Sequence, residues 1–161
     1  MAKPTPSDMR SSLEDARFFY DKLNPIIRGP EQRQDLELIR RYFRAYLHCW
    51  KCVPHFVREI KGLSGKKNDP AWIAWTKRWA LKLDTSDYEV FECLRKTRDH
   101  DTHEGMIEVK GEIATGLFPI VMFQPGKGSG PRRELVSCCD RGLFVADHMI
   151  REYPSLTPEP V

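Results

Sequence analysis

The sequence has no hydrophobic run long enough to cross a membrane, which argues against the membrane-spanning classes of protein. A transmembrane helix needs about 18 or more consecutive apolar residues, whereas 30% of this chain is charged. Its opening segment, MAKPTPSDM, also lacks the apolar stretch of a secretory signal peptide. We therefore expect a cytoplasmic protein with no membrane partner.

The cysteines lack a pattern of pairs, and neither sign of charge dominates. The five cysteines are an odd number without the spacing of a secreted disulfide scaffold, so we expect reduced thiols. The net charge of +3 does not by itself indicate a nucleic-acid partner. Residues 51–82, however, hold eight basic residues against two acidic ones. That segment either meets a phosphate backbone or forms a solvated basic face.

Internal repeats and a phosphate-binding loop are also missing. The absence of repeats argues against a solenoid, and the segment KGSG at 127–130 lacks the GKS or GKT core of a nucleotide-binding loop. With 161 residues and 40% apolar content, the chain can bury one core without disulfides or metal. We expect a single domain over residues 1–161.

Apolar residues at three- and four-residue steps predict helices over most of the chain. Residues 1–7 are expected to fray, and a first helix should run from Ser7 to near Pro25. A longer stripe covers residues 39–60, in which Pro54 predicts a kink or a division into two shorter helices.

A third helix should begin at Pro70, with Asn68 or Asp69 as its cap. Its three tryptophans share one face, which is more typical of a core than of a nucleobase-stacking surface. Residues 106–124 change to a strand-like period and predict a β-hairpin or an extended flap. Residues 125–132 then predict a flexible loop.

The last helix should begin at Arg133 and end before Pro154. Together these elements predict an all-α fold, a bundle of about five helices with the hairpin or flap inserted before the last one. A fourth helix completes the set. The spacing of Ser86 and Glu89 predicts its start as a capping box, and Gly105 predicts its end.

The end of this fourth helix carries the densest group of ionisable residues, RKTRDHDTHE at 95–104. Asp99 and His103 are four apart, so the carboxylate can orient the imidazole. Arg98 and His103 are five apart, which separates them by roughly 140° around the axis. They can reach one phosphate only through the length of arginine, a loosened last turn or a second copy of the chain. The alternative is a helix end whose charges face water.

These features, in this order, resemble HEPN-like proteins. The resemblance rests on the aromatic helix RRYFRAYLHCWKCVPHFVREI, the segment WIAWTKRW and the motif that runs from Arg98 to His103. It implies that Arg98 binds phosphate and stabilises the transition state, and that His103 is the general acid and base. Asp99 stands where asparagine is commoner. Arg95 and His100 form a second, overlapping match that ranks lower.

The resemblance implies a metal-independent endoribonuclease that needs no cofactor and leaves a 2′,3′-cyclic phosphate. HEPN ribonucleases pair two chains, so it also implies a homodimer with RNA as its substrate. The alternative is a non-catalytic binding or dimerisation domain in a toxin–antitoxin or defence system. Its partner would then be an antitoxin or a nucleotidyltransferase.

A competing metal site lies in the aromatic helix, where two imidazoles and two thiols fall within eight residues: His48, Cys49, Cys52 and His55. Zinc binds such mixtures of ligands. These residues belong to an apolar helical stripe, however, and the second half of a zinc finger is absent. Cysteine commonly packs as a small hydrophobe, so core packing is the favoured interpretation.

Overall fold

The computed structural model of the chain describes most of its length. For residues 100–103, 112–114 and 118–119 it describes the backbone alone. The described ranges are 2–28, 35–63, 69–103, 107–114, 118–125 and 131–155. Within them, no helix combines the length and the apolar character needed to span a membrane.

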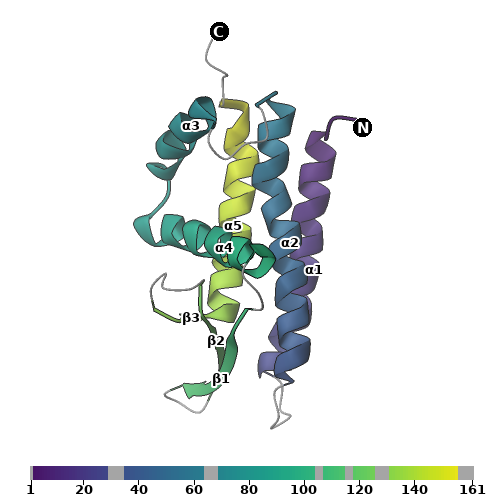
Figure 1. Cartoon of the computed structure of the whole chain (residues 1–161), viewed down its shortest axis with the longest axis vertical. Helices are drawn as coiled ribbons and strands as arrows, with labels where there is room; N and C mark the ends of the chain where they lie inside the picture. The colour runs from purple at the N-terminus through teal and green to yellow at the C-terminus, as the bar shows by residue number, and fades with distance from the viewer. Residues whose placement is uncertain are drawn as a thin grey trace.

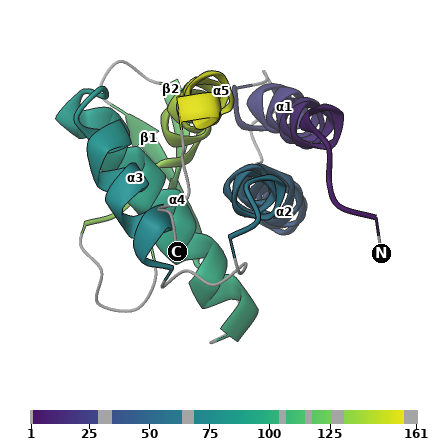
Figure 2. The same cartoon turned by 90° about the horizontal axis from the view of Figure 1, so that it is seen from above.

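Three long helices lie side by side and form the main bundle (Figures 1 and 2). Their buried faces make one continuous core with the shorter elements. Antiparallel strands join this bundle just before its last helix, so the expected architecture of helices with an inserted hairpin is confirmed. The three helices are α1 (Pro6–Arg28), α2 (Leu36–Ile60) and α5 (Leu135–Glu152).

Helix α1 is longer at both ends than the sequence predicts. It begins at Pro6, inside the segment expected to fray, where Thr5 and Asp8 bond to each other in a capping arrangement. It also continues through Pro25 to Arg28. A proline inside a helix costs about 3 kcal/mol. Burial of Ile27, which is 1% exposed, offsets much of this cost, since a buried isoleucine contributes about 1.5–3 kcal/mol.

Helix α2 runs unbroken through Pro54, so the predicted division into two helices is wrong. Val53 and Val57, on either side of the proline, are fully buried and hold this part of the helix against the core. The helix ends in a Schellman motif, in which Gly62 has φ +72°. The N–H of Leu63 donates to the carbonyl of Arg58 at 2.9 Å and closes the motif.

Helix α3 (Pro70–Ala80) begins as the sequence predicts. The Asp69 carboxylate accepts from the backbone N–H of Ala71 at 2.9 Å, and Pro70 occupies the first turn. Its tryptophans are buried, which confirms their core role. The Trp79 indole donates to Nδ1 of His148 on α5 at 2.9 Å and fixes α3 to the bundle.

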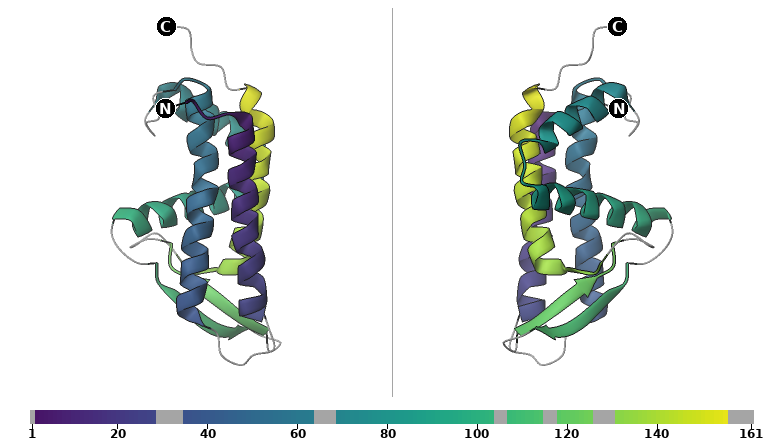
Figure 3. Two further views of the ribbon diagram at one scale, coloured as in Figure 1. Left: turned by 90° about the vertical axis from the view of Figure 1, so that its right-hand side faces the viewer. Right: turned by 90° about the vertical axis from the view of Figure 1, so that its left-hand side faces the viewer.

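Helix α4 (Thr85–His103) crosses the bundle over α2 and α5 (Figures 1 and 3). It begins one residue before Ser86, and the expected partner of that serine, Glu89, meets Arg133 at 3.7 Å instead. Its inner face includes Phe91 and Leu94, which are 5% and 0% exposed. This crossing brings the ionisable end of α4 next to α2.

An ion pair fixes the first turn of α4 to α5. Both carboxylate oxygens of Asp87, which is 4% exposed, accept from the guanidinium of Arg141, at 2.8 and 2.6 Å. Hydrogen bonds to charged groups contribute about 1.5–3 kcal/mol. The pair therefore holds the start of α4 against α5 and helps to set the direction in which α4 crosses the bundle.

Replacing Asp87 with asparagine is expected to lower the free energy of unfolding by about 1–2 kcal/mol, because the amide keeps the shape but only one oxygen acceptor. Urea denaturation measures this. The matched control is Glu37→Gln, which removes an exposed carboxylate paired with Arg40 and should cost less than about 0.5 kcal/mol. Equal losses in the two variants would show that the Asp87 pair is no stronger than a surface contact.

The predicted hairpin is present as β1 (Val109–Ala114) and β2 (Phe118–Phe123), which pair antiparallel with Gly111 opposite Val121. A third strand, β3 (Arg133–Glu134), pairs with β2 and was not expected. The sheet covers the lower end of the bundle (Figure 3). The rings of Phe123 and Phe43 lie 4.9 Å apart. The hairpin is therefore part of the core and not a flap.

Helix α5 begins at Leu135, two residues later than expected, because Arg133 belongs to the sheet. The Glu134 carboxylate caps it by accepting from the backbone N–H of Ser137 at 2.6 Å. The helix ends at Glu152, before Pro154, as predicted. Of the expected loop at 125–132, residues 126–130 lie outside the described part of the chain.

Candidate functional site

Arg98 lies where α4 crosses α2, and the residue it meets there is His48. The guanidinium Nη2 of Arg98 is 3.4 Å from Nδ1 of the imidazole, across 50 residues of sequence. Arginine can only donate, so a hydrogen bond here requires Nδ1 to accept, with the ring proton on Nε2. His48 is exposed, and Arg98 is partly exposed. The crossing thus places a guanidinium and an imidazole together at the surface of one chain.

The Asp99 carboxylate contacts basic side chains on both α2 and α4. One carboxylate oxygen pairs with Nζ of Lys51 on α2, and the other lies 3.6 Å from Nη1 of Arg95. The Asp99 side chain is 19% exposed. Its negative charge is therefore balanced locally, and the carboxylate ties α4 to α2 beside Arg98.

The side chain of His103 lies outside the described residues, although the backbone of α4 is described as far as this position. The same holds for His100. The structure therefore leaves the pairing of Arg98 with His103 as a prediction. In the lower-ranked match, Arg95 is paired with Glu92, whose Oε2 accepts from its Nη2 at 2.9 Å. This hydrogen bond raises the pKa of Arg95.

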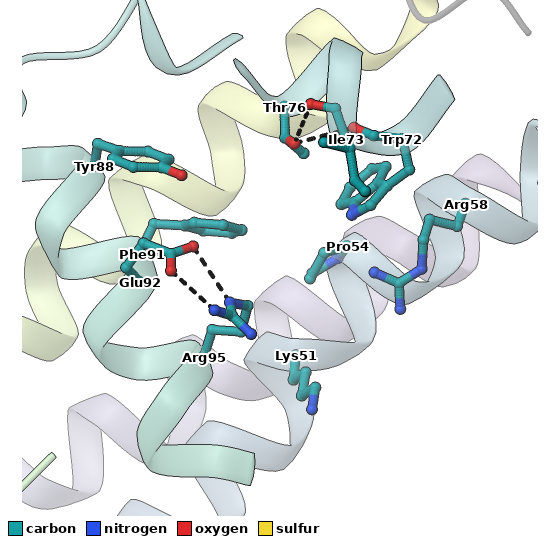
Figure 4. Close-up of a pocket in the computed structure, with 10 residues that line it drawn as sticks. All are labelled: Lys51, Pro54, Arg58, Trp72, Ile73, Thr76, Tyr88, Phe91, Glu92 and Arg95. Carbon is teal, nitrogen blue, oxygen red and sulfur yellow. Dashed lines mark hydrogen bonds and ion pairs between the residues drawn. The ribbon is translucent and has the colours of Figure 1, made fainter. Parts of the chain in front are cut away.

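A pocket of about 310 Å³ opens beside this crossing, between α2, α3 and α4 (Figure 4). Pro54, Trp72 and Phe91 form apolar parts of its wall. Lys51 and Arg95 also line it, and both contact Asp99, the residue after Arg98. The pocket therefore lies about one helical turn along α4 from Arg98, since Arg95 lines it.

Arg58 is the most buried cation of this pocket. Only 8% of the residue is exposed, and its guanidinium lies 5.0 Å from the centre of the Trp72 ring. Its Nε has no hydrogen-bond partner among the described residues. Burial lowers the pKa of Arg58, while the charges of Asp99 and Glu59 act in the opposite direction. A buried cation with an unused donor is costly unless something pairs with it.

Several cations of the basic segment at 51–82 are used in contacts within the chain. Arg58 stacks on Trp72, Lys61 lies over the ring of Tyr153, and Lys82 pairs with Glu152. Lys51, as noted, pairs with Asp99. Two further lysines of the segment lie outside the described residues. The described part of this segment therefore does not form a simple solvated stripe, and some of its charge lines the pocket.

The histidines and cysteines of α2 do not gather around one point. The thiol of Cys52 donates to the backbone carbonyl of His48 at 3.3 Å, and Nε2 of His55 lies 3.0 Å from Glu59. Burial raises the pKa of the thiols of Cys49 and Cys52, which opposes the thiolate form that binds metals. In the described part of the chain, no three His, Cys, Asp or Glu side chains form a group that could hold a metal ion. All five cysteines are free thiols.

Sequence reasoning favoured a place in the core for His48, with a zinc site as the alternative, whereas the structure places this histidine at the surface beside Arg98. No local pattern pairs position 48 with position 98, because only the crossing of α2 and α4 brings them together. Comparison with known proteins adds nothing to this picture: no family model, no curated protein and no solved structure matches the chain.

Proposed function

We propose that this protein is a metal-independent endoribonuclease of the HEPN type, in which Arg98 binds the scissile phosphate. The observation that supports this most directly is the placement of the Arg98 guanidinium beside the His48 imidazole at the α2–α4 crossing. Arginine presents N–H donors in a fork that matches phosphate oxygens, and imidazole transfers protons near neutral pH. The two groups together suit phosphodiester cleavage.

The reaction needs a base and an acid. The base removes the proton of the 2′-OH, whose oxygen attacks phosphorus and displaces the 5′-oxygen. The acid supplies the proton that this leaving oxygen takes up, and the product is a 2′,3′-cyclic phosphate. Arg98 stabilises the charge on the phosphorane between these steps.

Two histidines are candidates for these roles. His103 is the acid–base residue implied by the HEPN resemblance, and a second chain in a homodimer would bring it towards Arg98. His48 offers an imidazole within one chain, 3.4 Å from the guanidinium. With both present, one acts as the base and the other as the acid. We place this activity in the cytoplasm, where RNA is the substrate.

The test is RNA cleavage by purified His103→Ala and His48→Ala variants, measured with EDTA present. We expect each variant to lose about 100-fold or more in rate, since a positioned acid or base contributes about 10²–10⁴. His55→Ala is the matched control, because this exposed histidine of α2 pairs with Glu59 and lies a turn beyond Lys51. Full activity of His103→Ala would refute the acid–base role of His103.

A second candidate is a non-catalytic binding or dimerisation domain with an antitoxin or nucleotidyltransferase partner. The chain of ion pairs from Lys51 through Asp99 and Arg95 to Glu92 favours it, because these contacts brace α2 against α4. On this account Arg98 serves packing alone. A wild-type protein that cleaves no RNA but forms a stable dimer would support this candidate over the nuclease.

A further inference from the structure

The pocket between α2, α3 and α4 has the size and the walls to hold one planar group. Its volume of about 310 Å³ is at the lower end of small-molecule sites, which span about 300–1,000 Å³. Three aromatic residues line it: Trp72 and Phe91 are 6% and 5% exposed, and Tyr88, which is partly exposed, offers the most accessible ring. Ile73, which is 39% exposed, lines the same pocket. Figure 4 shows these side chains and the basic ones arranged around one space.

The charges in this pocket favour an anion. Three cations line it. Lys51 and Arg95 are paired with Asp99 and with Glu92, the one lining carboxylate among the described residues, so the excess positive charge is that of Arg58. Arg58 is more than nine-tenths buried, and its Nε has no hydrogen-bond partner in the described structure. A ligand anion that pairs with this guanidinium would compensate a buried positive charge whose present state is unfavourable.

We propose that this pocket binds one unpaired nucleotide of RNA, with the base against the aromatic wall and a phosphate at Arg58. Proteins hold splayed RNA bases by stacking them on aromatic rings and guanidinium planes, and hold the backbone with cations. The identity of the polymer rests on the proposed nuclease function. Arg95, which lines the pocket, is three residues from Arg98, about 4.5 Å along α4. Arg58 is ten residues from His48, about 15 Å along α2, so the bound nucleotide lies near the cleaved bond but is not the one attacked.

Calorimetric titration with the four nucleoside 5′-monophosphates tests the chemistry of the ligand. Inorganic phosphate and ribose 5-phosphate are the comparison probes. We expect at least one nucleotide to bind about ten-fold or more tightly than ribose 5-phosphate, because one stacked base contributes about 1–3 kcal/mol. Equal affinity for all three kinds of probe, or no binding of nucleotides at millimolar concentration, would overturn the proposal.

A matched pair of substitutions at the pocket rim tests its location. Ile73→Glu adds a negative charge to the wall of the pocket and should weaken nucleotide binding about ten-fold. Ile73→Gln introduces a side chain of nearly the same shape as glutamate but without its charge, so it should change nucleotide affinity less than three-fold. Because Ile73 is exposed, both variants should fold. Identical affinities in the two variants would place the ligand elsewhere.

Arg58→Met tests the buried guanidinium, with circular dichroism as the check on folding. We expect at least a ten-fold loss of nucleotide affinity, whereas Lys96→Met, an exposed cation on α4, should bind as wild type. Unchanged affinity in a folded Arg58→Met protein would remove Arg58 from the site. Should this variant fail to fold, the Ile73 pair still decides the question.

RNA hexamers with 2′-O-methyl groups separate this proposal from the nuclease proposal, because they bind but cannot form the cyclic phosphate. Binding of hexamers that Ile73→Glu weakens supports the pocket even if wild type cleaves no RNA. Cleavage of RNA by wild type with no effect of Ile73→Glu on hexamer binding overturns the pocket and leaves the nuclease in place.

Discussion

From the proposed nuclease function, Arg98→Ala is expected to cleave RNA at least about 100-fold more slowly than wild type, with its helical content unchanged. Removing one preorganised donor from the charge that develops in a transition state commonly costs about 10²–10³ in rate. The fold should survive because Arg98 is partly exposed, whereas the core contacts of this part of α4 come from Leu94 and Thr97, both 0% exposed. Single-turnover cleavage with excess enzyme measures the chemical step.

Two further variants sharpen this result. Lys96→Ala removes an exposed cation two residues away on α4 and should retain nearly full activity. Arg98→Lys keeps the positive charge but lacks the planar set of guanidinium N–H donors, so its cleavage rate should lie between those of Arg98→Ala and wild type. An equal loss in Arg98→Ala and Lys96→Ala would mean that general positive charge, and not the Arg98 guanidinium, supports cleavage.

Gly142→Ala is expected to destabilise the protein by about 2 kcal/mol, although alanine is the better helix former. A methyl group at this position of α5 would collide with Cδ1 of Leu94 and lie 2.6 Å from Oη of Tyr46. The Tyr46 hydroxyl cannot move freely, since it donates to the carbonyl of Cys139 at 2.7 Å. The Trp50 indole likewise donates to the Gly142 carbonyl at 2.8 Å.

The magnitude follows from two opposing effects. Overpacking a core costs about 1–3 kcal/mol, with further loss if a buried hydrogen bond breaks. The gain in helix propensity from glycine to alanine is about 1 kcal/mol. The melting temperature should fall by about 4–8 °C. Ser137→Ala, at an exposed position of the same helix, should leave it nearly unchanged. A Gly142→Ala protein as stable as wild type would show that α4 and α5 can separate without cost.

Helix α3 shows what sequence reasoning could recover. An acidic cap, a proline at the first position and three tryptophans on one face are local features, and each of them predicts the structure directly. The ends of α1 were missed, and a division of α2 at Pro54 was considered, for the opposite reason. Pro25 and Pro54 disfavour helix locally, and the burial of their neighbours, which depends on the whole fold, outweighs that preference.

The candidate site was predictable only in part. The ionisable end of α4 could be found from residue types, and its orientation towards a neighbouring helix from the stripe that includes Leu94 and Arg98. The pairing of Arg98 with His48 and the position of Arg58 depend on how α2, α3 and α4 cross. Gly142 could have been used to predict a close contact between helices, because a glycine inside a helix usually has a packing reason.

The proposed metal-independent cleavage is tested most directly by incubating RNA with wild-type protein in the presence of EDTA and identifying the chemical groups at the ends of any fragments. We expect fragments that end in a 2′,3′-cyclic phosphate and begin with a 5′-hydroxyl, formed at least about 100-fold more slowly by Arg98→Ala. Fragments with 3′-hydroxyl ends, or cleavage that stops on adding EDTA and returns with a divalent metal, would contradict this proposal.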